Sequence, residues 1–150
     1  MSALIWAALA VLCASTAPIA QAAGTSHRQA IEQQWKSSDC GIADAKQVVI
    51  RTREDWAALW QVMHRRRLPT PPLPDVDFAH QTVLGVFLGE RSGGGSGVEI
   101  TSITQRGDTL VAIVKETSPP TRTFQTMALT QPCHVVVVNA PAASVKFQTR

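Results

Sequence analysis

The sequence predicts an α+β fold, with a mostly antiparallel sheet of five to seven strands and one main amphipathic helix at about residues 53–66. Three observations lead to this prediction. One segment carries apolar residues at helical spacing behind a capping sequence, several short segments alternate apolar and polar residues, and Gly and Pro mark the turns between them. For 150 residues, a single domain is the simplest organisation.

The first residues predict a secretory signal peptide. Residues 3–13 form an uninterrupted apolar run, and small residues follow it up to an A-x-A pattern that ends at Ala22. The run is too short to span a bilayer, which needs roughly 20 residues. We therefore divide the chain into a signal peptide at 1–22, an N-terminal segment at 23–47 and a main domain at 48–150. We expect an exported, periplasmic or extracellular protein.

Two cysteines, Cys40 and Cys133, follow the predicted leader. An even pair in an exported protein predicts one disulfide. A free structural thiol is one alternative, and a catalytic or metal-binding thiol beside His134 is another. Adjacent residues of a strand point to opposite faces, which disfavours a working pair of Cys133 and His134.

The N-terminal segment is polar, and His27–Trp35 within it is interpreted as a short helix. The clearest helix comes later. Thr52 and Asp55 fit a capping box, in which a hydroxyl caps the first free amides and an acid three residues on reaches back. An apolar stripe then recurs at helical spacing and consists of Trp56, Leu59, Trp60 and Met63.

The strands are predicted from apolar patterning. Four prolines between residues 68 and 74 cannot continue the helix and predict an extended connector. Residues 82–88 are almost wholly apolar, so we place them in the sheet interior with both faces covered. Alternating segments at 98–105 and 109–115 flank a Gly-containing turn and predict a hairpin. The other strands are expected at 48–50, within 121–130, at 133–139 and at 145–148.

The glycine-rich loop "GERSGGGSG", residues 89–97, is the main candidate for function. Its spacing approaches that of a phosphate-binding loop, but Gly95 stands where that loop has lysine, and a strand follows in place of a helix. We expect no nucleotide and no other cofactor. Glycines let another backbone approach closely, so the loop is either a surface for a partner's peptide or a mobile loop without one. The candidate contact residues are Arg91, Gly93, Gly94, Gly95, Ser96 and Gly97.

Four stretches together resemble a known family. They are "VVIRTREDWAALW", "VDFAHQTVLGVFLGERSGGGSGVEITSI", "TLVAIVKET" and "LTQPCHVVVV". In this order and spacing they are similar to the C-terminal domain of the PrcB protease-complex subunit family, over about residues 48–147. That family commonly has Thr-Gly-Gly-Tyr in the loop, where this chain has Gly93 in place of the threonine and Ser96 in place of the tyrosine. The resemblance implies an exported, non-catalytic subunit that associates with or stabilises a secreted protease.

The residues themselves point away from catalysis. The chain has no hydrolase nucleophile elbow and no zinc-binding helix, and its histidines lack metal-ligand spacing. His134 is expected to be a strand residue whose ring is hydrogen-bonded. Asp75 and Asp77 are close enough to pair as acid and base, but an acidic segment before a strand more often forms a turn. We expect neither an enzyme nor a metal site.

The hypothesis is therefore a polypeptide-binding module. An added strand can pair with a sheet edge, and residues 91–97 with the adjoining edge would meet a protease or its substrate. The alternatives are a structural cell-envelope protein and a protease inhibitor. The formal charge of +3 is mild, so we expect no nucleic-acid partner, and we expect no stable membrane span.

Overall fold

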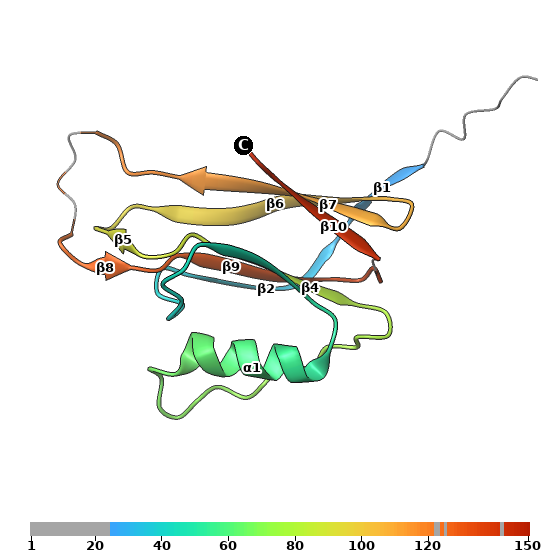
Figure 1. The fold of residues 1–150 in the computed structure, drawn as a ribbon, viewed down its shortest axis with the longest axis horizontal. Helices are drawn as coiled ribbons and strands as arrows, with labels where there is room; N and C mark the ends of the chain where they lie inside the picture. Colours follow the sequence, from blue (N-terminus) through green and yellow to red (C-terminus); the bar gives the residue numbers. More distant parts are fainter. Residues whose placement is uncertain (1–24, 122–123, 125, 142) are drawn as a thin grey trace, which may run out of the picture.

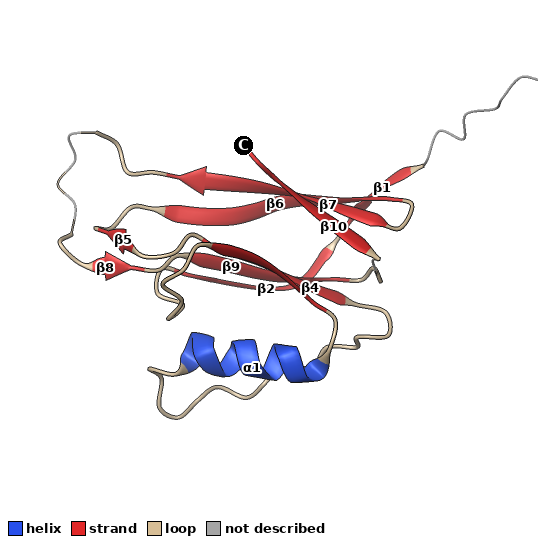
Figure 2. Cartoon of the chain, viewed as in Figure 1, coloured by secondary structure: helices blue, strands red, loops and turns tan. Residues whose placement is uncertain are grey.

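The computed structural model describes residues 25–121, 124, 126–141 and 143–150, so the signal peptide predicted at 1–22 lies outside the described residues. The domain has three layers (Figure 1). Two four-stranded sheets are stacked, and one helix covers the outer face of the second sheet. The predicted α+β class is confirmed, and Figure 2 shows how strands dominate the chain. The described residues hold ten strands, where the sequence predicted five to seven.

The first sheet has the strand order β1–β6–β7–β10. The predicted hairpin is confirmed as β6 and β7, which turn at Gly107 with a φ of 57°. β1 adds antiparallel to β6, whereas β10 adds parallel to β7. The strands are β1 (Ser26–Gln29), β6 (Gly97–Arg106), β7 (Thr109–Thr117) and β10 (Ser144–Thr149).

The second sheet has the order β2–β9–β4–β3 and is antiparallel throughout. Its strands are β2 (Ile31–Ser37), β9 (Cys133–Val138), β4 (Thr82–Phe87) and β3 (Lys46–Ile50). Every residue of β4 and β9 is buried. The first sheet covers one face of these strands and the helix covers the other, which explains why they are apolar at every position and confirms the interior placement predicted for β4.

The helix expected at His27–Trp35 is wrong, because this segment forms β1 and most of β2. The polar segment has no strong preference of its own, and its backbone groups pair with β6 and β9 instead. Residues assigned from the sequence to a separate N-terminal segment thus supply an outer strand to each sheet.

The helix α1 (Arg53–His64) begins as predicted, with the Asp55 amide donating to the Thr52 hydroxyl at 3.2 Å. Its two tryptophans pack on Trp35 of β2, with ring centroids 5.3 Å and 5.4 Å from that ring. The proline connector covers them, since the indole N–H of Trp56 donates to the Pro74 carbonyl and that of Trp60 to the Pro71 carbonyl.

Two short strands form a separate ribbon at one end of the sandwich. β5 (Arg91–Ser92) lies in the glycine-rich loop and pairs antiparallel with β8 (Leu129–Thr130). The strand expected within 121–130 is thus confirmed only at its end. In Figure 1 this ribbon lies at the left end of the domain, away from β1.

Candidate polypeptide-binding site

The glycine-rich loop leaves β4 through a tight contact. Gly89 has a φ of 77°, and a Cβ there would lie 2.8 Å from the Ala45 amide nitrogen and 2.9 Å from the Ala43 carbonyl oxygen. The next amide, of Glu90, donates to that same carbonyl at 2.9 Å. Only glycine fits this crossing, so the start of the loop is fixed against residues 43–45.

The middle of the loop is bonded to another segment of the same chain. The Gly93 amide donates to the Ala128 carbonyl at 2.9 Å, and the Gly94 amide donates to the Thr126 carbonyl at 3.2 Å. In return, the Thr130 hydroxyl donates to the Gly93 carbonyl at 2.9 Å. The backbone that these glycines admit is therefore the chain's own segment before β9. A partner would meet the ribbon that the two segments build together.

Exposed apolar side chains lie on this ribbon and in the segment that leads to it. Phe124 and Met127 are fully exposed and Leu129 is 68% exposed. Beside them lies a groove of about 400 Å³, which we call the β5–β8 groove and which is lined by Ser92, Gly93, Met127, Ala128 and Leu129. Among the described residues, five large apolar side chains are exposed. Two of them, Met127 and Leu129, line this groove, and Phe124 precedes them in the sequence. Such clustering of apolar surface is typical of an interaction site.

The predicted contact residues take up different positions. Gly93 lines the β5–β8 groove, whereas Arg91 lines another hollow of about 340 Å³, shared with Lys46 and Glu116. Gly95 has a φ of 89°, and a Cβ there would lie 2.9 Å from the Cβ of Pro119. At Gly97 a Cβ would meet nothing within 4 Å. The backbone amide of Gly94 is hydrogen-bonded to the Thr126 carbonyl. Ser96 is half-buried just before β6.

Sequence reasoning missed Phe124, Met127 and Leu129. From the sequence, residues 121–130 are predicted only to contain a strand. A signal was available, because three large apolar residues stand there in a stretch that is otherwise polar or small. Strand alternation alone does not say which of them face water.

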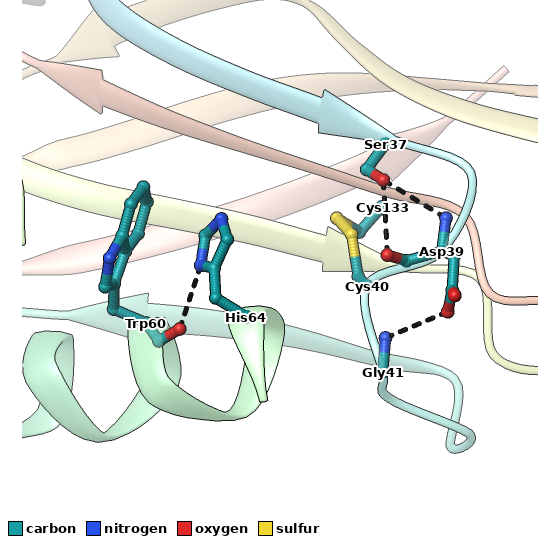
Figure 3. The surroundings of a disulfide bond; sticks show 7 residues. All are labelled: Ser37, Asp39, Cys40, Gly41, Trp60, His64 and Cys133. Carbon is teal, nitrogen blue, oxygen red and sulfur yellow. Dashed lines mark hydrogen bonds between the residues drawn. A yellow bond between two sulfur atoms is a disulfide. The ribbon is translucent and has the colours of Figure 1, made fainter. Parts of the chain in front are cut away.

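A disulfide joins Cys40 to Cys133, as the sequence predicts, and its Cα atoms are 6.1 Å apart (Figure 3). A turn precedes Cys40, in which the Asp39 amide donates to the Ser37 hydroxyl. The Cys40 amide donates to the Gln131 carbonyl at 3.0 Å, so backbone bonds support the link. Both cysteines are buried. The bond fastens the N-terminal segment to the first residue of β9, beside the ribbon.

His134 lies on the other face of β9 and joins the two sheets. Its Nδ1 accepts the Ile100 amide of β6 at 2.8 Å, and its Nε2 lies 3.1 Å from the Gln34 side-chain oxygen of β2. Since an amide N–H can only donate, Nδ1 is unprotonated and the proton is on Nε2. Burial lowers the pKa of this imidazole, with Lys36 acting in the same direction and Glu99 against it. The opposite-face argument is confirmed, because Cys133 packs on the helix side.

Asp75 and Asp77 engage different partners. Asp77 accepts the Ala79 amide at 3.0 Å and lies 2.7 Å from the His80 ring nitrogen, and these two bonds lower its pKa. Asp75 instead pairs with Arg53 at 3.3 Å. The segment is therefore a hydrogen-bonded turn. Within the described residues, no group of three His, Cys, Asp or Glu side chains is placed to hold a metal ion.

Within the described residues, the helix α1 is not long and apolar enough to cross a membrane. No curated protein and no solved structure matches the chain. Residues 82–139 match the family model described as PrcB C-terminal, which indicates a domain associated with protease complexes. The matched stretch runs from β4 to the end of β9 and includes the β5–β8 groove. This match, over residues 82–139, supports the resemblance to the PrcB C-terminal family that the sequence indicates.

Proposed function

We propose that this chain is an exported, non-catalytic polypeptide-binding module, a subunit that associates with or stabilises a secreted protease. The partner would contact the β5–β8 groove. One observation carries the proposal: exposed apolar side chains gather on a ribbon that the family match includes. The predicted leader at 1–22 and the disulfide favour export.

The chemistry of the groove suits a polypeptide. Met127 and Leu129 offer adaptable apolar contacts, and a methionine side chain adjusts to different partner shapes. β5 and β8 pair only with each other among the described strands, so each also has an open backbone edge. An extended peptide can add to such an edge while its side chains fill the groove.

The test replaces Leu129 with serine and compares the result with Leu68→Ser, a leucine 93% exposed just beyond α1. A photo-crosslinker at Met127 should capture a protease in the periplasm, and Leu129→Ser should reduce that capture at least about tenfold. Leu68→Ser should leave it unchanged. The proposal fails if both leucine variants behave alike, or if the crosslinker captures no protease.

A second assay separates the alternatives. The purified chain is added to the captured protease, and its activity and thermal half-life are followed. A stabilising subunit lengthens the half-life without lowering the initial rate, whereas an inhibitor lowers the initial rate.

A further inference from the structure

The outer edge of β3 is open. β3 ends the second sheet, and among the described strands only β4 pairs with it. In Figure 1 it is the strand that leads into α1. One row of backbone N–H and C=O groups along Lys46–Ile50 therefore points away from the sheet. Such a row is a template for another strand, so proteins cover it or blunt it.

An apolar groove lies beside this edge. It holds about 360 Å³ between β3 and α1, and its apolar lining comes from Ile42, Val48, Val49, Ile50, Ala58, Leu59 and Val62. Val48 is half-buried, and Val62 on the helix is 40% exposed. A strand added to β3 would place every second side chain in this groove.

The groove has opposite charges at its ends. Lys46 begins β3, and Asp55 lies in the first turn of α1. Both are exposed and line the groove. Lys46 shares the helix-side face with Val48 and Ile50, because its ammonium lies 5.8 Å from the Phe87 ring on that side. A second β3 running antiparallel would bring its own Lys46 opposite Ile50, toward Asp55. The same contact would recur by symmetry.

We propose that the β3 edge is a dimerisation surface on which a second copy of this chain adds its own β3 antiparallel, with Val48 opposite Val48. This register pairs residue i with residue 96 − i, so residues of equal parity face each other. The residues whose backbone N–H and C=O groups point outward therefore lie opposite each other on the two strands and can hydrogen-bond. It also keeps the apolar side chains of each strand on the helix side. A twofold pairing is self-complementary and closes, as soluble homodimers do. The surface is distinct from the β5–β8 groove.

The oligomeric state of the disulfide-bonded chain tests the proposal. Sedimentation equilibrium should show a monomer–dimer equilibrium at concentrations below about 1 mM. Val62→Lys and Lys46→Glu should each raise the dimer dissociation constant at least about tenfold, because they place an unmatched charge in the interface. Gln61→Lys is the matched control. It adds the same charge at the adjacent exposed position of α1, outside the groove, and should change the constant less than about twofold.

Crosslinking tests the register. Opposed residues in antiparallel strands have Cα atoms about 4.5–5.5 Å apart, within the range of a disulfide. Val48→Cys should therefore form a covalent dimer on oxidation, whereas Gln47→Cys, opposite Val49 of the second copy, should not. The proposal is overturned by a monomer at all concentrations, by equal effects of Val62→Lys and Gln61→Lys, or by equal crosslinking at 47 and 48. A monomer whose β3 amides become protected only with an added extended peptide overturns it too, and assigns the edge to another polypeptide.

Discussion

Replacing His134 with glutamine should have two effects. It should weaken the hydrogen bonding between β9 and β6, and it should remove a pH dependence of the free energy of unfolding. The ring accepts the Ile100 amide and bonds Gln34, and it is buried. If the glutamine amide cannot reach Ile100, a buried N–H loses its acceptor, which costs about 1–3 kcal/mol of unfolding free energy. Urea denaturation at pH 7.5 measures this loss.

The pH dependence follows from the lowered pKa of His134, whose first cause is burial. Above the ordinary value of 6.5, the ring is neutral in both the folded and unfolded chain. As the pH falls below that value, the unfolded chain takes up a proton that the folded chain resists, so the folded state loses stability. The loss continues down to the folded pKa, with a limiting slope of about 1.4 kcal/mol per pH unit.

Protonation also reverses the role of Nδ1, which would then present a proton to the Ile100 amide. The charged groups nearest the ring, Lys36 and Glu99, are bonded to each other at 2.8 Å and largely offset each other. We therefore expect the wild type to lose stability between pH 7.5 and 5.5, by at most about 1.4 kcal/mol, and His134→Gln to lose much less. His27→Gln, at an exposed position of β1, is the control and should keep the wild-type slope. Equal slopes in the wild type and His134→Gln would refute this reasoning.

Three further outcomes are expected, each read from urea denaturation. Replacing both Cys40 and Cys133 with alanine should cost up to about 4–5 kcal/mol, because the bond closes a loop of 93 residues; a cost below about 1 kcal/mol would contradict this. Gly95→Ala should destabilise by about 1–2 kcal/mol through its φ and its contact with Pro119, while Gly97→Ala stays within about 0.5 kcal/mol; equal effects would contradict it. Thr52→Ala should cost about 1 kcal/mol by removing the helix cap, and an unchanged midpoint would argue against that role.

Local sequence patterns were enough to predict those elements whose structure depends mainly on residues close together in the sequence. The cap at Thr52 and the stripe of Trp56 and Trp60 specified α1, because a helix forms between residues near in sequence. The hairpin of β6 and β7 followed from alternation around Gly107. The burial of β4 and β9 followed from their apolar composition.

Other features needed partners far along the chain. Nothing local makes His27–Trp35 a pair of strands, and its pairing with β6 and β9 joins residues up to about a hundred positions apart. The sequence pattern marks the glycine-rich loop as a candidate contact site, but it gives no such indication for residues 126–130, which pair with that loop. Only the pairing of β5 with β8 and the exposure of Met127 and Leu129 mark these side chains as candidates for partner contact.

The sequence alone determined the class of fold, the main helix α1, the buried central strands and the two cysteines available for bonding, since each depends on composition or on spacing within a few residues. Tertiary structure alone decided that β10 runs parallel to β7, that His134 ties one sheet to the other, and that β3 keeps an open edge. Those features depend on which distant backbone groups meet. A chain of alternating apolar residues can satisfy its hydrogen bonds with several possible neighbours, and only the packing of the whole domain selects among them.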